Sequence, residues 1–310
     1  MLFPNKQEYV AGGTKFGGEA LTVRIDIELL KKLIEQPDSL AKAADSPGFK
    51  LYWLSLGRDH NQAIAELQGQ NARIAALAQE DANGKSILGT LGRISGASIE
   101  QQVVRHLPAG ITANATVEFV PGGDLALAAE GNLVAVNFFA FEQRNNKLFV
   151  GDFPLLSFLA NRIHQLCTAK LALPLFEAGG AFENFLCRML REGSATLFFT
   201  LPVSGPVFSL WQQSEKRREE EVQLLRRSLH AQDRNSALVR ELEYSLSLPG
   251  SAALAARYPL GAWMCQVIEG AFGRDHLVAL LQRPQDFVAD FEQARTKFGL
   301  PEKYSLAAPR

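Results

Sequence analysis

The chain has 310 residues, and its 32 Lys and Arg against 33 Asp and Glu give a formal net charge of −1. That balance excludes a protein built mainly to grip nucleic-acid backbones, which needs a surplus of positive charge. Apolar residues make up 47% of the chain, which is enough to bury a substantial core. We therefore expect a single domain over residues 1–310, with a helical N-terminal part at 1–109 and the rest at 110–310.

The N-terminal part shows helical periodicity in three places. Apolar residues recur three or four positions apart in Asp26–Gln36, Asn61–Gln79 and Ser98–Leu107. This spacing places the apolar side chains on one face and predicts three amphipathic helices.

Two β-rich segments follow Gly110. Thr116–Val120 and Asn132–Phe141 are apolar and rich in β-formers, and the first ends at the turn signal Pro121-Gly122-Gly123-Asp124. We expect two strands joined by a hairpin-like connection. They would form one small sheet in an otherwise helical chain, which is an α+β fold that is mainly α-helical.

The rest of the chain reads as helical. Pro154–Leu171 and Ala181–Phe199 are predicted to be two buried apolar helices. Gln213–Ser245 is predicted to be one long polar helix, and we interpret its charged segment Glu215–Glu221 as a solvated face. Three further helical segments complete the C-terminus: Tyr258–Ala271, Asp275–Leu281 and Pro284–Phe298.

The N-terminal sequence MLFPNKQEYVAGG lacks the basic and apolar regions of a signal peptide, and no apolar stretch is long enough to span a membrane. We therefore expect a cytoplasmic location. The three cysteines, Cys167, Cys187 and Cys265, are widely spaced and form no CxxC pair. Their apolar neighbours favour small buried core residues over a zinc or disulfide framework.

Both of the predicted buried helices contain polar residues among their apolar ones. Asn161, His164 and Gln165 are three or four positions apart and share one face of the first helix, while Glu192 lies in the second. A buried polar side chain costs free energy unless it is satisfied. Helical proteins build metal or acid–base sites from polar side chains on two facing helices.

The order strand, Pro-Gly-Gly turn, apolar strand, motif helix and Glu192-Gly193-Ser194-Ala195 resembles gluzincin-type zinc-dependent metallopeptidases. Tyr258-Pro259-Leu260-Gly261, followed by Met264, Ile268 and Gly273-Arg274, resembles the same family, so the resemblance covers residues 110–298. It implies a zincin-like fold. It also implies two zinc histidines four positions apart (HExxH) beside a catalytic glutamate, and a third ligand from a glutamate in EGxA on the next helix.

This chain departs from the family at most of those positions. The metal-ligand positions fall on Asn161, Gln165 and Glu192, and the general-base position falls on Arg162. Neutral amides are poor zinc ligands, and arginine stays protonated at any working pH. The zinc motif is therefore degenerate, and we expect no bound metal or other cofactor, although active relatives use zinc.

Arg162 has two interpretations: its guanidinium replaces the zinc charge opposite Glu192, or the side chain is exposed and points elsewhere. His164 matches an extra, non-ligating histidine of the family and is most simply a core residue. Tyr258 falls where an active relative carries a tyrosine that stabilises an oxyanion, though packing is the simpler explanation for it here.

The sequence thus favours a metallopeptidase-like pseudoenzyme that has lost zinc binding and peptidase activity and binds a peptide or protein partner. One alternative is an active hydrolase with a non-standard site, either a metal held by His164 and Glu192 or a Cys167–His164 pair. Another is a structural or interaction module that uses the charged helix at 213–245.

Overall fold

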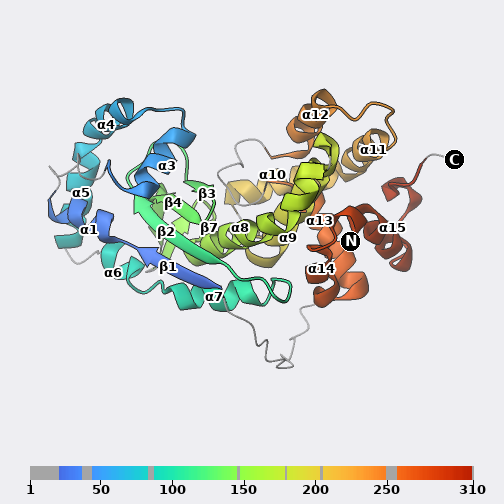
Figure 1. The fold of residues 1–310 in the computed structure, drawn as a ribbon, viewed down its shortest axis with the longest axis horizontal. Helices are drawn as coiled ribbons and strands as arrows, with labels where there is room; N and C mark the ends of the chain where they lie inside the picture. Colours follow the sequence, from blue (N-terminus) through green and yellow to red (C-terminus); the bar gives the residue numbers. More distant parts are fainter. Residues whose placement is uncertain are drawn as a thin grey trace.

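The computed structural model describes residues 21–36, 44–82, 87–144, 147–178, 180–202, 205–248 and 257–308. It is mainly helical with strands, which confirms the α+β prediction, but it has two small sheets where the sequence predicted one (Figure 1). The N-terminal sequence examined for a signal peptide lies outside the described residues. Within the described ranges, no helix combines the length and apolar character needed to cross a membrane.

The larger sheet has the order β1-β2-β4-β3. Its strands are β1 (Thr22–Asp26), β2 (Asn114–Val120), β3 (Leu127–Glu130) and β4 (Leu133–Asn137). β1, β2 and β4 are parallel, whereas β3 is antiparallel to β4 and forms an edge. The hairpin prediction for the two apolar segments was therefore wrong: the chain after the Pro-Gly-Gly turn first forms β3, and it is β3 that makes a hairpin with β4.

The predicted second strand also ends sooner than expected. The Asn137 side chain accepts a hydrogen bond from the Phe139 backbone N–H at 3.0 Å and caps a 3-10 turn at Phe138–Ala140. The chain then enters a separate antiparallel sheet of β5 (Phe141–Arg144), β6 (Lys147–Val150) and β7 (Phe153–Pro154). The continuous apolar segment Asn132–Phe141 thus contributes β4 to the larger sheet and the first residue of β5 to the smaller one.

The N-terminal helices lie around the larger sheet (Figure 1). They are α1 (Glu28–Glu35), α3 (Pro47–Ser55), α4 (His60–Gln68), α5 (Asn71–Ala82), α6 (Ile87–Leu91) and α7 (Gly96–Val104). The segment predicted as one helix at Asn61–Gln79 is two helices, because α4 ends at Gly69. This part is also not purely helical: β1 joins the sheet, where Val23 is buried.

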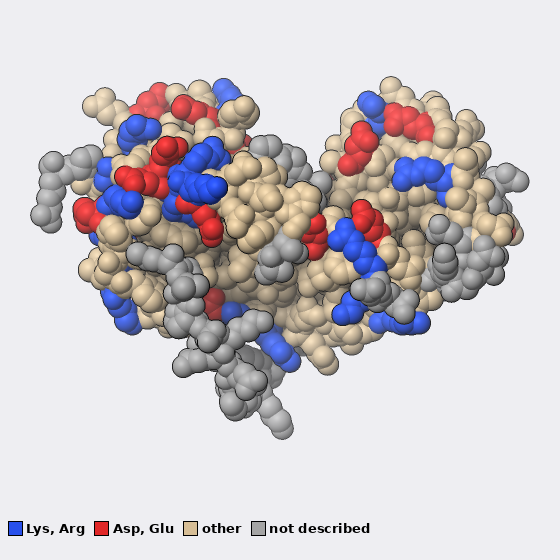
Figure 2. Space-filling model, turned by 180° about the vertical axis from the view of Figure 1, so that it is seen from behind, with Lys and Arg blue, Asp and Glu red and all other residues tan. Residues whose placement is uncertain are grey.

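Two long helices, α8 (Leu155–Ala178) and α9 (Ala181–Phe199), link the two halves of the molecule (Figure 1). α8 packs mainly into the hydrophobic core around the sheet, whereas α9 packs into a second core made by the C-terminal helices. The prediction of two apolar helices was correct. From behind, the surface shows a deep notch between the two halves, with positive and negative side chains intermixed on both (Figure 2).

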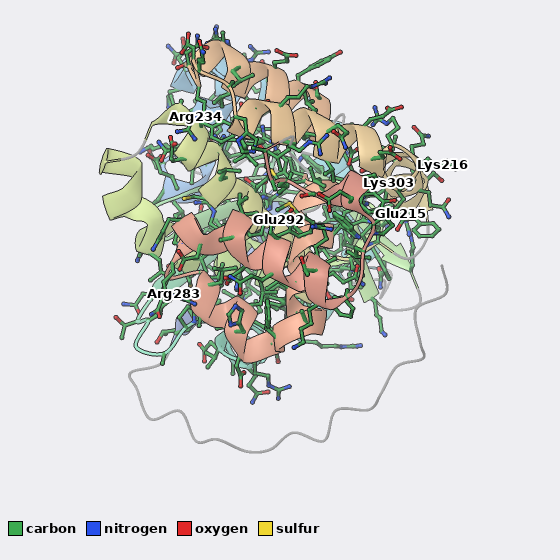
Figure 3. The ribbon with its side chains drawn as sticks, turned by 90° about the vertical axis from the view of Figure 1, so that its right-hand side faces the viewer. Glu215, Lys216, Arg234, Arg283, Glu292 and Lys303 are labelled. Atoms are coloured by element: carbon green, nitrogen blue, oxygen red, sulfur yellow. The ribbon has the colours of Figure 1, made fainter. Side chains whose placement is uncertain are left out.

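The C-terminal half is helical throughout its described residues. After α8 and α9 it contains α10 (Gly205–Lys216), α11 (Arg218–Leu229), α12 (Ser236–Leu246), α13 (Pro259–Phe272), α14 (Arg274–Leu280) and α15 (Phe287–Lys297), with 3-10 turns at Pro284–Asp286 and Glu302–Tyr304. Seen from this end, Arg234, Lys216 and Lys303 lie at the periphery, and Glu292 lies nearer the centre (Figure 3).

The single long helix predicted at 213–245 is instead parts of α10, α11 and α12. Its charged segment is not a solvated face throughout, because Arg218 and Glu221 are each only 6% exposed. The Ser214 hydroxyl donates to the Glu221 carboxylate at 2.8 Å, and Arg218 donates to the Pro259 carbonyl at 3.1 Å. Contacts with α10 for Glu221 and with α13 for Arg218 thus accompany the burial of charges that the local sequence assigns to the surface.

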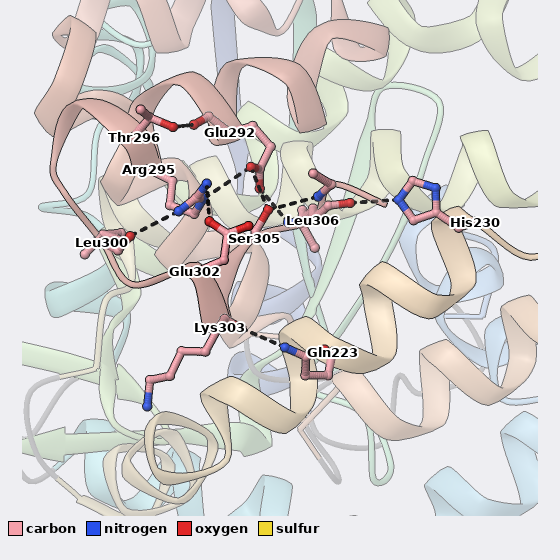
Figure 4. A network of polar contacts seen from close by, with 11 residues as sticks. Gln223, His230, Glu292, Arg295, Thr296, Leu300, Glu302, Lys303, Ser305 and Leu306 are labelled. Carbon is pink, nitrogen blue, oxygen red and sulfur yellow. Dashed lines mark hydrogen bonds and ion pairs between the residues drawn. The ribbon is translucent and has the colours of Figure 1, made fainter. Parts of the chain in front are cut away.

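The C-terminal segment is tied down by a polar network (Figure 4). The Glu292 carboxylate accepts hydrogen bonds from the Ser305 hydroxyl and the Leu306 backbone N–H. His230, the residue directly after α11, has its Nε2 2.9 Å from the Leu306 carbonyl oxygen, while the Leu306 side chain is buried at 2% exposure. Polar anchoring and apolar burial therefore act together on this segment.

Candidate functional site

The residues that the sequence assigned to a degenerate zinc motif lie on α8 (Asn161, Arg162 and Gln165) and α9 (Glu192). Asn161 is fully buried, and its amide nitrogen donates to the Thr200 hydroxyl at 2.9 Å. The Gln165 amide nitrogen donates to the Asn161 carbonyl oxygen at 2.8 Å, and Arg162 donates to the Gln165 carbonyl oxygen at 3.1 Å. Three of the motif positions are thus joined in one hydrogen-bonded chain along α8.

Glu192 is held in place by a close crossing of α9 over α13. A Cβ added to Gly193 would lie 2.5 Å from the Gly261 carbonyl carbon, and one added to Gly261 would lie 2.6 Å from the Met189 oxygen. Only glycine permits such an approach. The two glycines of the motif segments 192–195 and 258–261 therefore serve helix packing, whatever else the segments do.

The remaining motif position, Glu192, lies close enough to Arg162 for their charges to interact. Glu192 is 8% exposed, and its charge still opposes the loss of the proton from Arg162, whose pKa burial lowers. Arg162 is therefore half-buried rather than exposed, and its charge interacts with that of Glu192. That its guanidinium replaces a zinc charge stays a prediction.

The residues present do not fit zinc. The Asn161 and Gln165 amides bond to each other and to Thr200 and Arg162, and amides are poor zinc donors in any case. Across the described part of the chain, no group of three or more His, Cys, Asp or Glu side chains is placed to hold a metal ion.

His164 is bound into the core. It is fully buried, its Nε2 donates to the His106 carbonyl at 3.0 Å, and its ring packs against Phe198 and Phe199. Burial lowers its pKa to about 4, so the ring is neutral near pH 7. No described contact links it to Glu192, so the geometry gives a His164–Glu192 metal site no support.

Cys167 is equally unsuited to act as a nucleophile. It is 1% exposed, and burial raises the pKa of its thiol to about 11, so the reactive thiolate is scarce at neutral pH. The described structure contains no hydrogen bond between Cys167 and His164. Cys187 and Cys265 are also buried, as the sequence predicted.

Tyr258 lies at the start of α13, fully buried, with its ring edge-on to Phe185 at 5.9 Å. Burial, and secondarily the negative charge of Glu192, raise the pKa of its phenol to about 12. Its hydroxyl has no hydrogen-bond partner among the described residues. Tyr258 does not line the groove described next, so its position favours packing.

A groove of about 520 Å³ runs between the edge strand β3 and the motif helix α8. It is lined by Leu127, Ala128, Ala129, Glu130, Gly131, Arg162, Gln165, Leu166, Ala169, Lys170 and Arg191. A second hollow of about 790 Å³ shares Gly131 and Lys170 with it and continues to the N-terminal ends of β1 and β2. Two motif positions therefore face an open groove, while Asn161 and Glu192 do not line it.

Sequence reasoning missed Lys170 and Arg191 as parts of this groove. A signal existed for each of them: Lys170 lies two helical turns beyond Arg162, and Arg191 directly precedes Glu192. The free edge of β3 gave no signal, because the strand itself was not predicted.

Comparisons of the chain with protein-family models, with curated proteins and with solved structures found no match.

Proposed function

We propose that this protein is a metallopeptidase-like pseudoenzyme of gluzincin type that binds a peptide segment in the groove between β3 and α8 without cleaving it. The observation that carries the proposal is the hydrogen-bonded chain from Thr200 through Asn161 and Gln165 to Arg162. It occupies two ligand positions and the general-base position of the motif with groups that neither bind zinc nor accept a proton.

The groove supports a peptide as the occupant. Among the described residues, β3 pairs only with β4, so its other edge carries backbone N–H and C=O groups without a strand partner from that part of the chain. Such an edge accepts an extended peptide as an additional strand, and side chains on the opposite wall supply selectivity. α8 provides that wall with Arg162, Gln165 and Leu166.

The test is to incubate the purified protein with a library of random decapeptides, separate bound from free peptides by gel filtration, and identify both by mass spectrometry. We expect the bound fraction to be enriched in a subset of sequences and every peptide to remain intact. Cleavage products, or roughly one tightly bound zinc per chain by elemental analysis, would contradict the proposal, as would the lack of any enrichment.

A matched pair of variants ties the binding to the groove. Ala129 is exposed on β3 and lines the groove, so Ala129→Trp fills it, whereas Ala65→Trp places the same side chain on the exposed face of α4. We expect the first variant to lose enrichment and the second to keep it. Equal binding by both would move the peptide site elsewhere.

A further inference from the structure

The walls of the β3–α8 groove carry more positive than negative charge. Three of its lining side chains are cationic, Arg162, Lys170 and Arg191, and one is a carboxylate, Glu130. The whole chain is almost neutral, at −1. The excess of positive charge is therefore a local property of this groove.

Arg191 is the most informative of these cations. Its Nε atom is buried and has no hydrogen-bond partner, and no ion pair to Arg191 exists among the described residues. Burial lowers the pKa of its guanidinium, and the nearest compensating charge is that of the neighbouring Glu192. A desolvated guanidinium without a direct partner is unfavourable by itself and is stabilised by any anion that reaches it.

Arg188, one turn earlier on the same helix, provides the comparison. It forms an ion pair with Glu243 of α12 at 2.6 Å. The fold thus supplies a carboxylate to one arginine of α9 and leaves the other facing the groove. Lys170 repeats the pattern, since it is exposed at the junction of the two hollows and pairs with no described carboxylate.

We infer that the groove selects an acidic peptide, whose carboxylates bind Arg191 and Lys170. The inference rests on the proposed function and names the ligand class of the same site. An extended peptide places alternate side chains on one face, so acidic residues at every second position would all point toward the wall formed by α8 and α9. Arg162 adds positive potential from within that wall.

The experiment measures fluorescence polarisation with three fluorescein-labelled decapeptides of alternating Glu-Ala, Gln-Ala and Lys-Ala sequence. We expect the Glu-Ala peptide to bind about tenfold tighter than the Gln-Ala peptide, and the Lys-Ala peptide to bind most weakly. The affinity of the Glu-Ala peptide is expected to fall as the salt concentration rises. A labelled decathymidylate tests the other class of polyanion, and binding as tight as that of the Glu-Ala peptide would overturn the choice of a peptide.

Substitutions assign the selectivity to named side chains. Arg191→Gln and Lys170→Gln are each expected to weaken Glu-Ala binding several-fold and to leave Gln-Ala binding unchanged. Glu130→Gln removes the one lining carboxylate and is expected to tighten Glu-Ala binding. Arg227→Gln makes the same type of change as Arg191→Gln at an exposed position of α11 and should alter neither.

The thermal midpoint of Arg191→Gln and the exposed position of Lys170 separate an effect on binding from an effect on folding. Because Arg191→Gln removes a buried charge that has no direct partner, its thermal midpoint should be unchanged or higher than that of the parent protein. A lower midpoint would indicate a structural role and overturn the assignment of Arg191. Lys170 is exposed, so Lys170→Gln tests the groove without risk to the fold.

The outcomes also distinguish this inference from the proposed function. If neutral and acidic peptides bind equally, and Ala129→Trp abolishes both, the acidic selectivity is refuted while the peptide groove stands. If the three peptides and the random library all fail to bind, both are refuted.

Discussion

Acid should destabilise this protein through His164, and the effect can be isolated. Burial lowers the pKa of His164 to about 4, against 6.5 for an ordinary histidine. The ring is therefore protonated more readily in the unfolded chain than in the folded protein. Its contribution to stability is fully present above pH 6.5 and is lost as the pH falls from 6.5 towards 4.

The magnitude follows from the two pKa values. At pH 5 the unfolded histidine lies 1.5 units below its pKa of 6.5 and is almost fully charged, whereas the folded one is still mostly neutral. At 1.36 kcal/mol per unit, the protein should lose about 2 kcal/mol between pH 7 and pH 5, and about 3 kcal/mol once the pH is below 4. His106, with which it shares a hydrogen bond, has its pKa lowered to about 3 by burial and adds a loss of the same sign.

The assay is urea unfolding at 25 °C at pH 7 and pH 5 for the parent protein and for His164→Gln, which keeps a donor for the His106 carbonyl but cannot titrate. We expect the parent protein to lose about 2 kcal/mol more than the variant over this interval. His60→Gln removes an exposed histidine of α4 and should behave like the parent protein. If His164→Gln loses as much stability as the parent protein, the buried neutral histidine is not the cause.

Three further outcomes are expected. Gly193→Ala should lower the free energy of unfolding in urea by about 1–3 kcal/mol, because the new methyl group meets the α13 backbone. As a control, the methyl group of Gly270→Ala meets only the tip of the exposed Phe298 ring, so this variant should be nearly neutral. Restoring the family motif with Asn161→His, Arg162→Glu and Gln165→His should yield roughly one zinc per chain by elemental analysis, and adding Glu192→Gln should weaken that binding; a triple variant without zinc would show that the motif is misplaced on α8. Glu292→Ala should cost about 1.5–3 kcal/mol by removing the anchor of the C-terminal segment, and an unchanged unfolding curve would refute that role.

Helical periodicity predicted the elements that are long and packed on one side. α8, α9 and α13 appear where their apolar spacing placed them, because burial of one face determines a helix of that length. Strand pairing could not be predicted in the same way. An apolar strand reads alike whether its neighbours are parallel or antiparallel, so β2 and β4 were assigned to a hairpin that does not exist.

The long helix predicted at 213–245 failed for two different reasons. Its second break carried a readable signal, since the Asn235 side chain caps α12 by accepting from the Ala237 and Leu238 backbone N–H groups. The first break did not, because the burial of Arg218 depends on Pro259 and on the Trp263 ring, which lie far along the chain. Local sequence reports caps, but it does not report which charges a distant helix will cover.

In the candidate site, too, local sequence indicated single residues but not the contacts between distant elements. The candidate positions Asn161, Arg162, Gln165 and Glu192 were assigned from the resemblance to a zinc motif, and the expectation that they bind no zinc followed from their residue types; both stay predictions. The groove was not found, because it needs the β3 edge from one part of the chain and Arg191 from another. A site assembled across elements has no contiguous sequence pattern.

The parallel pairing of β1 with β2 affects how the protein is synthesised. β1 leaves the ribosome well before β2, which begins at Asn114 and is its strand partner among the described residues. The Glu100 carboxylate, which accepts a hydrogen bond from the Val23 backbone N–H at 2.7 Å, also comes much later than β1. Until then Val23 and Ile25 have no sheet to join, whereas β2, β3 and β4 emerge close together. The sheet is thus expected to assemble from its C-terminal strands, with the nascent N-terminal strand added last. A ribosome stalled before Asn114 would hold a chain with an exposed apolar strand, which chaperones bind.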